Sequence, residues 1–219
     1  MCNLYSLTMA REAVARLFRV PHNRMQQGNP LPAIFPGRMA PVVRASADGE
    51  RELVDLSWGF VLKQKDRAPK RVTNVRDDKA LISPFWKDSF ASRRCLVPAT
   101  SFAEPREVTP ATWHWFGLQG AEPRPLFAFP GIWRRYKGPI RKNGDPVELD
   151  VFAFMTTLPN ALVATINHER MPVILTEEKQ FETWLHGSTQ DAVALVHSHD
   201  PERMRMVQSG FKKEDPVEA

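Results

Sequence analysis

Prolines occur along the whole of this chain and strongly constrain what it can fold into. There are 19 of them in 219 residues, and each lacks the backbone N–H that a helix interior or a central strand needs. Between them lie short runs rich in β-branched and aromatic residues, which are bounded by turn-forming residues. This pattern predicts a sheet-dominated, loop-rich fold of the α+β class.

The short runs predict an alternation of strands and helices. Strands are expected at 4–7, 39–45, 52–60, 94–98, 112–118, 126–133, 149–156, 172–175 and 204–209. Helices are expected at 9–18, 83–90, 177–185 and 190–197, with Thr8 and Thr176 as N-caps. Residues 21–36 and 63–71 are expected to be loops, 138–145 a hairpin tip and 212–219 a frayed tail. Since no repeat or linker is recognisable, we expect one domain over residues 1–219.

The composition limits where such a chain works and what it binds. The net charge is +5 and the pI about 9.4, a balance compatible with a polyanionic partner. No run of about 18 apolar residues predicts a membrane span, and residues 1–17 do not read as a signal peptide. Cys2 and Cys95 are too few for a disulfide scaffold. We therefore expect a cytoplasmic protein without membrane contact.

Cys2 has the most distinctive chemistry in the chain. An initiator methionine before a small residue is usually removed, and removal of Met1 would give Cys2 a free α-amine beside its thiol. An α-amine with an ordinary pKa of about 7.7–8.0 can attack an aldehyde to form a Schiff base. The thiol can then close a five-membered thiazolidine ring. The plainer interpretation is that Cys2 is an early residue of the first strand.

The familiar metal and cofactor motifs are absent from the sequence. It has no CxxC, HExxH, GxGxxG or Walker loop, and its six histidines are scattered. We therefore expect neither a bound metal nor a cofactor.

Polar residues interrupt apolar runs in several segments. They are Asn74 and Arg76, Glu104, Thr156, and His168 with Arg170. Thr156 falls at the end of an expected strand, and His168 and Arg170 shortly before one. A side chain at such a place is held rigidly and still reaches solvent, which suits a functional site. In an extended segment, Asn74 and Arg76 project to the same face.

Each of these residues also has an ordinary interpretation. Asn74 is a common turn residue, Arg76 could be a solvated charge, and Glu104 could be a loop acid. His168 could bond a backbone carbonyl at the end of a strand. Cys95, inside an apolar run, is expected to be buried and inert, and Trp58 is of a type that usually packs in a core.

Taken together, the motifs resemble the SOS response-associated peptidase (SRAP) family in order and spacing. The matching segments are Met1-Cys2-Asn3-Leu4-Tyr5-Ser6, Ala40-Pro41, Trp58-Gly59, Asn74-Val75-Arg76, Arg94-Cys95-Leu96-Val97-Pro98-Ala99, Phe102-Ala103-Glu104 and His168-Glu169-Arg170-Met171-Pro172-Val173. The resemblance spans the chain from Cys2 to about Leu175. It implies a single SRAP-type domain with a mainly antiparallel, barrel-like sheet and short flanking helices.

The resemblance also implies a function, which is to sense and shield abasic sites in single-stranded DNA. Cys2 would become N-terminal and form a thiazolidine crosslink with the ring-opened sugar. Asn74 would position its α-amine, and Glu104 and His168 would be the catalytic carboxylate and histidine. The residues implied to contact DNA, or to lie beside it, are Arg76, Arg170, Trp58 and Thr156. We expect a monomer that associates with the nucleoid when bound to DNA.

The chain departs from the family pattern at two places that concern DNA. Many members have Cys-Gly-Arg at the start, whereas Leu4 stands here at the position of the arginine. After Trp58-Gly59-Phe60 the family often continues with proline and further tryptophans, whereas this chain has Lys63 and Lys65 in that region. These departures affect the docking of DNA and leave the chemistry of Cys2 intact.

Two other functions are compatible with the sequence. One is a cysteine peptidase or amidase in which Cys2 attacks an acyl carbon with His168 as the base, acting on peptides or only on its own Met1. The other is a non-enzymatic module for single-stranded DNA, which would tolerate Cys2→Ala without loss of affinity.

Overall fold

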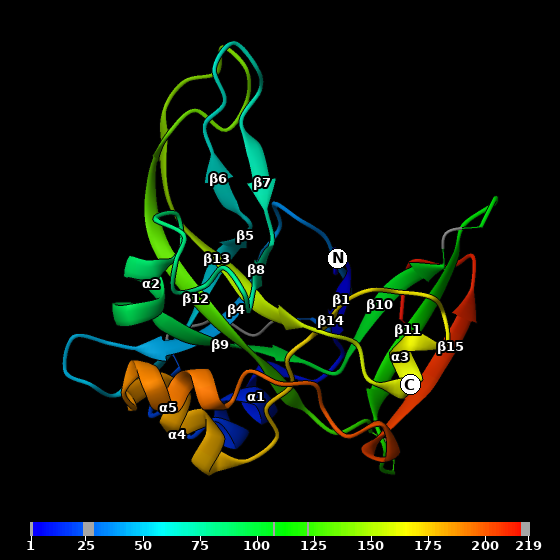
Figure 1. The fold of residues 1–219 in the computed structure, drawn as a ribbon. Coiled ribbons are helices and arrows are strands. Elements are labelled where there is room, and N and C mark those ends of the chain that lie inside the picture. The colour runs from blue at the N-terminus through cyan, green and yellow to red at the C-terminus, as the bar shows by residue number, and fades with distance from the viewer. Residues whose placement is uncertain (1, 24–28, 107, 122, 216–219) are drawn as a thin grey trace.

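A computed structural model describes residues 2–23, 29–106, 108–121 and 123–215 (Figure 1). One of its two main sheets has five strands in the order β15-β11-β10-β1-β3. The bounds of these strands are β1 (Tyr5–Leu7), β3 (Leu31–Ile34), β10 (Ser101–Arg106), β11 (Thr112–Leu118) and β15 (Met204–Gly210). The four neighbouring pairs within it are all antiparallel.

The larger sheet has eight strands and closes on itself. Its order is β14-β13-β12-β9-β4-β5-β2, and β8 pairs with β13 outside this path. The bounds are β2 (His22–Asn23), β4 (Met39–Ala45), β5 (Arg51–Trp58), β8 (Asn74–Arg76), β9 (Arg94–Ala99), β12 (Phe127–Gly138), β13 (Val147–Thr157) and β14 (Met171–Pro172). Because β13 also pairs with β5 through Val151 and Ser57, the strands β13, β12, β9, β4 and β5 form a ring. The predicted mainly antiparallel, barrel-like core is therefore confirmed.

Short helices flank the barrel, as predicted. They are α1 (Arg11–Leu17), α2 (Lys87–Ser92), α3 (Ala161–Ala164), α4 (Glu178–His186), α5 (Thr189–Ala194) and the 3-10 turn η1 (Pro201–Arg203). Helix α4 buries Phe181, Trp184 and Leu185, which share one face at helical spacing. The indole of Trp184 donates hydrogen bonds to the carbonyls of Cys95 at 2.9 Å and Gly131 at 3.0 Å, which fixes α4 against the barrel. None of the described helices has the length and apolar character needed to cross a membrane.

The two sheets share one apolar core. Tyr5 of β1 places its ring 5.0 Å from Trp58 of β5, 5.6 Å from Phe129 of β12 and 5.9 Å from Phe154 of β13, each in an edge-on contact. The chain passes directly between the sheets at Thr100, because β9 belongs to the barrel and β10 to the five-stranded sheet. The first strand is therefore held against the barrel, and the residues just before it lie where the two sheets meet.

A third, two-stranded sheet forms an arm. Strands β6 (Phe60–Leu62) and β7 (Lys70–Val72) pair as a hairpin, and the ends of β12 and β13 rise beside it (Figure 1). The predicted loop at 63–71 is therefore partly wrong, because its last residues belong to β7. The expected strand at 52–60 is split at Gly59, whose φ of 105° lies in the left-handed region.

Two further expectations differ from the structure. The segment predicted as loop at 21–36 contains β2 and β3, each of which forms a strand only by pairing with a distant partner. Thr8 does not cap α1, since the helix begins at Arg11 and its N-cap is Ala10. The Thr8 hydroxyl instead lies 3.0 Å from the Thr100 hydroxyl.

Candidate active site

Cys2 lies just before β1 and is held in a buried position. Only 1% of its surface is exposed, and its thiol donates to the carbonyl of Leu4 at 3.5 Å. That carbonyl also accepts the backbone N–H of Ala103 at 2.9 Å, which continues the pairing of β1 with β10 beyond Tyr5. The pairing therefore brings Cys2 alongside the part of β10 that carries Glu104.

Asn74 reaches Cys2 from the barrel. It is the first residue of β8, which runs parallel to β13 with Asn74 opposite Phe154. Its side-chain amide donates to the carbonyl of Cys2 at 2.7 Å and to the hydroxyl of Thr73 at 2.7 Å. Its Oδ1 is buried and has no hydrogen-bond partner among the described residues. Asn74 thus fixes the backbone of Cys2 and keeps one acceptor unused.

Glu104 and His168 contact each other at the same place. The Oε2 of Glu104 lies 3.0 Å from the Nε2 of His168, and the two side chains are 0% and 11% exposed. Glu104 comes from β10, whereas His168 precedes β14. Asn167 has a φ of 60°, a left-handed conformation that asparagine tolerates well, and it turns the chain directly before His168. The buried carboxylate therefore has an imidazole on its solvent side.

The surroundings of Cys2 keep its thiol protonated. Burial raises the pKa of the thiol well above its ordinary value, and the negative charge of Glu104 raises it further. The hydrogen bond to Leu4 acts in the opposite direction and is outweighed. The Cys2 thiol is therefore held neutral beside a carboxylate. A neutral thiol brings its own proton to the reaction together with the nucleophilic sulfur.

Thr156 and Arg170 lie in a second polar group next to the site. Arg170 donates to Asp77 at 2.7 Å and also to the backbone carbonyl of Thr156. Hydrogen bonds from Arg170 and Thr157 lower the pKa of Asp77 despite its partial burial, which acts in the other direction. Arg170 is only 9% exposed, and the Oγ1 of Thr156 is buried without a partner among the described residues. Arg170 is thus engaged by Asp77 in the free protein.

The two remaining predicted residues differ sharply in position. Arg76 is exposed and makes a bidentate ion pair with Asp78, with a shortest distance of 2.9 Å. Trp58, which was expected near a DNA-binding cleft, is 0% exposed and stacks on Phe152 and Phe154. The Trp58 indole therefore packs in the core and donates to the carbonyl of Thr73, next to Asn74, so its expected place beside the DNA stays a prediction.

A buried acidic residue behind the site was missed. Asp215 is 2% exposed and makes an ion pair with Arg124 at 2.7 Å. Its carboxylate also accepts hydrogen bonds from the hydroxyls of Ser6 at 2.5 Å and Ser101 at 2.6 Å. These serines lie on the neighbouring strands β1 and β10, so Asp215 joins the two strands that carry Cys2 and Glu104. The predicted frayed tail is therefore wrong at Asp215, and residues 216–219 lie outside the described part.

The sequence as a whole matches one protein family. The family model described as SOS response associated peptidase (SRAP) matches residues 1–210. The chain belongs to this family. The match includes every residue of the site just described except Asp215.

Individual SRAP relatives have names that point to DNA. "Abasic site processing protein YoqW" of Bacillus subtilis is 30% identical over 158 residues, which make up 70% of this chain and 67% of YoqW. "Abasic site processing protein YobE" of the same species is 29% identical over 141 residues, or 62% of this chain and 59% of YobE.

Solved structures share the fold of this SRAP chain. A protein from Bordetella bronchiseptica superimposes with a TM-score of 0.73 and 19% identity, covering 95% of this chain and 98% of the other. A protein from Bacteroides thetaiotaomicron gives the same TM-score and identity, covering 99% and 97%. At this level of identity the likeness concerns the fold alone.

Proposed function

We propose that this SRAP protein processes abasic sites in single-stranded DNA by forming a covalent thiazolidine crosslink through Cys2 after loss of Met1. The observation that carries the proposal is the buried Glu104 carboxylate, which lies next to the Cys2 thiol and 3.0 Å from the His168 imidazole. The names of the YoqW and YobE relatives supply the substrate class. One chain carries all of these groups, so a monomer suffices.

The proposed reaction begins when the abasic sugar opens to its aldehyde. The freed α-amine of Cys2 adds to the aldehyde carbon, and the carbinolamine loses water to give an imine. The Cys2 sulfur then adds to the imine carbon, and the thiol proton passes to the nitrogen. The sum is one aldehyde and one aminothiol giving one thiazolidine and one water, and it requires no oxidant and no metal.

Each neighbouring side chain has a role in this sequence. Opening the hemiacetal and expelling water both need proton transfer, for which Glu104 and His168 are in contact. His168 is partly exposed, so it can exchange the proton with solvent. Asn74 holds the backbone of Cys2 and has a free buried acceptor, Oδ1, for the α-amine that removal of Met1 would release.

The same geometry supports a general cysteine peptidase less well. A peptidase thiolate is usually stabilised by a neighbouring cation that lowers the pKa of the cysteine. Here burial and the Glu104 carboxylate raise the pKa of the Cys2 thiol instead. Cleavage of Met1 by the protein itself would need only a single turnover. It is tested separately by the intact mass of protein made without an aminopeptidase.

The proposed crosslink is tested directly on a denaturing gel. Purified protein is incubated with an oligonucleotide that carries one abasic site, and the same oligonucleotide without the lesion serves as the control. We expect a shifted band that survives heat and detergent for the wild type and for Cys95→Ala, and none for Cys2→Ala. Cys95 is the matched control because it is the other free cysteine and is also buried.

The intact mass of the protein shows whether Met1 has been lost, and the gel result is interpreted with that knowledge. A protein that has lost Met1 and still gives no band would sink the proposal. Cleavage of peptide substrates by that protein would then favour the peptidase.

Arg76 supplies a second prediction. It is exposed, so Arg76→Ala should weaken non-covalent binding of all DNA sequences alike and reduce the slope of log affinity against log salt by about one unit. Fluorescence anisotropy of Cys2→Ala protein over a salt series measures this slope. Arg203→Ala, which removes an exposed arginine on η1, is the control. A loss confined to particular sequences would contradict a phosphate contact.

A further inference from the structure

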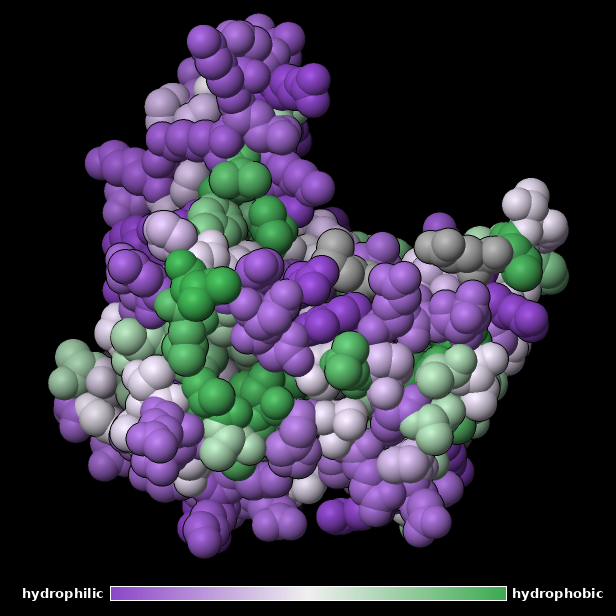
Figure 2. Space-filling model, viewed as in Figure 1, coloured by the Kyte–Doolittle hydropathy of each residue, from purple (hydrophilic) through white to green (hydrophobic). Residues whose placement is uncertain are grey.

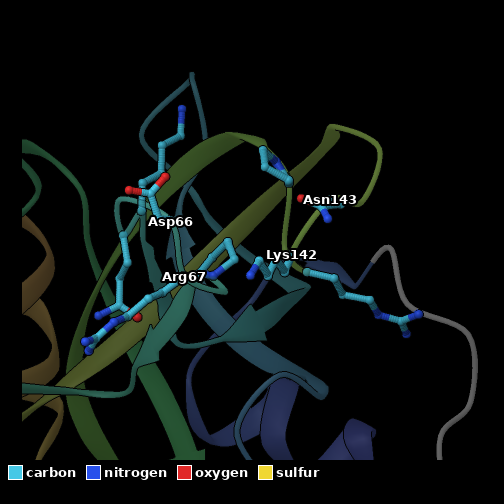
Figure 3. A pocket seen from close by; sticks show the side chains of 9 residues that line it. Asp66, Arg67, Lys142 and Asn143 are labelled. Atoms are coloured by element: carbon cyan, nitrogen blue, oxygen red, sulfur yellow. The ribbon is translucent and has the colours of Figure 1, made fainter.

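The arm described above ends in a pocket that the proposed chemistry does not use. The loop after β6 and the loop between β12 and β13 meet there around a volume of about 320 Å³. Figure 3 shows Asp66 and Arg67 on the first of these loops and Lys142 and Asn143 on the second. The remaining lining residues are Lys63, Gln64, Pro69, Pro139 and Arg141. Asp66 and Arg141, which are about 75 residues apart in the sequence, therefore line the same pocket.

The two loops are fixed to each other below the pocket. The guanidinium of Arg134 in β12 donates to the carbonyl of Val61 in β6 at 3.0 Å and lies over the ring of Phe60 at 4.5 Å. Higher up, a side chain added at Gly138 would place its Cβ 3.2 Å from the Cε of Lys63. The strands below the pocket are thus tied together, so both loops start from one packed arm.

The charge of the pocket is strongly unbalanced. Lys63, Arg67, Arg141 and Lys142 line it, against a single acid, Asp66. None of these four cations makes an ion pair with any carboxylate in the described part of the chain. Neighbouring exposed cations repel one another, so holding four of them around one hollow favours an anion with several charges.

The lining residues indicate which kind of anion fits. The pocket contains no aromatic side chain on which a base could stack. It therefore suits phosphate groups and carries no means of reading a base edge. A nucleic-acid backbone is the phosphate ligand that offers many such groups in a row.

The arm leads from the pocket to the candidate active site. Strand β7 ends at Val72, and only Thr73 separates it from Asn74, which binds the backbone of Cys2. Figure 1 shows β1, which directly follows Cys2, between this arm and the projection formed by β10, β11 and β15. The surface between the arms is hollowed in Figure 2, and the upper arm is hydrophilic.

We propose that the pocket at the tip of the arm binds backbone phosphates of the DNA at a distance from the sugar held by Cys2. This inference rests on the proposed function. The bound strand would run from the hollow along the arm, so that the pocket adds affinity without adding sequence preference. Many family members have an arginine at the position of Leu4, and this chain does not. The lysines and arginines at the tip would supply part of the DNA binding that this arginine provides.

The test removes three charges from the pocket. In Cys2→Ala protein, where binding stays non-covalent, Arg67→Gln, Arg141→Gln and Lys142→Gln are combined. The control combines Lys87→Gln, Lys179→Gln and Arg203→Gln, which remove three exposed cations elsewhere. Anisotropy over a salt series is measured with intact single strands of about 25 and about 5 nucleotides, since the shorter is near the lower limit of single-strand site sizes.

The expected result is specific to length. For the long strand, the pocket variant should lose about 2 units of the salt slope, because each phosphate contact contributes about 0.7. Binding of the short strand should match that of the control variant. An equal salt slope for the pocket and control variants on the long strand would overturn the inference. In that case, a normal crosslink of the wild type on the denaturing gel would show that the proposed function still stands. Binding of inorganic triphosphate that depends on the three residues, with an unchanged DNA slope, would overturn the assignment to DNA.

Discussion

Replacing Glu104 with glutamine is expected to slow formation of the crosslink by about 10²–10⁴-fold, the usual contribution of a general acid or base. Glutamine keeps the shape of the side chain but removes the carboxylate that exchanges a proton with His168, whose Nε2 lies 3.0 Å from the Oε2 of Glu104. Non-covalent DNA affinity should change little, because Glu104 is 0% exposed. A quenched time course on denaturing gels gives the rate, and anisotropy in a Cys2→Ala background gives the affinity.

The same substitution has a second effect that a purely structural role would not produce. The charge of Glu104 raises the pKa of the Cys2 thiol, so its removal should lower that pKa even while the crosslink forms more slowly. The pH dependence of thiol alkylation measures this shift. His168→Gln should reproduce the slow crosslink, whereas His186→Gln, at an exposed histidine of α4, should not. Wild-type rates in both Glu104→Gln and His168→Gln would exclude the proposed proton transfer.

Replacing Asp215 with alanine is expected to lower the free energy of unfolding by about 3–5 kcal/mol. The substitution leaves the guanidinium of Arg124 buried, at 5% exposure, without its carboxylate partner. It also takes one acceptor from the hydroxyls of Ser6 and Ser101. Urea unfolding followed by tryptophan fluorescence measures the loss.

The neighbouring residue provides a matched control for Asp215. Glu214 is exposed, so Glu214→Ala should change the free energy of unfolding by no more than about 0.5 kcal/mol. The double variant Asp215→Ala, Arg124→Met should regain part of the loss, because it no longer buries the positive charge that Asp215 neutralises. Equal stability of Asp215→Ala and Glu214→Ala would mean that the ion pair contributes nothing.

Strands with a strong local signal could be predicted from the sequence. The bounds of β4 and β11 agree with the predicted residues, because their β-forming residues are bounded by turns. Strands β2 and β3 had no such signal, since each depends on pairing with a partner far away in the chain. Helix α4 was found within one residue, although its cap is Glu177 with a capping box to Gln180 rather than Thr176.

The candidate site was predicted less evenly. Local pattern singled out Cys2, Asn74, Glu104 and His168 as unusual, and only the resemblance to a family suggested that they work together. The sequence left two interpretations of Trp58 open, a core residue and a residue beside the DNA, and the structure encloses it between three aromatic rings from both sheets. Nothing in the sequence around Asp215 predicts its burial. The only related signal lay elsewhere, in the polar residues Ser6 and Ser101 of apolar strands, whose buried hydroxyls need a hydrogen-bond partner.

The passage of the chain between the sheets at Thr100 has a consequence for when this protein becomes reactive. Glu104 belongs to the five-stranded sheet and Cys2 directly precedes its strand β1, whereas Asn74 belongs to the barrel and His168 lies in the segment before its strand β14. A chain in which one sheet has formed without the other therefore holds half of the reactive set. Under the proposed chemistry, a partly folded polypeptide would crosslink DNA only slowly, and completion of folding would itself raise the rate.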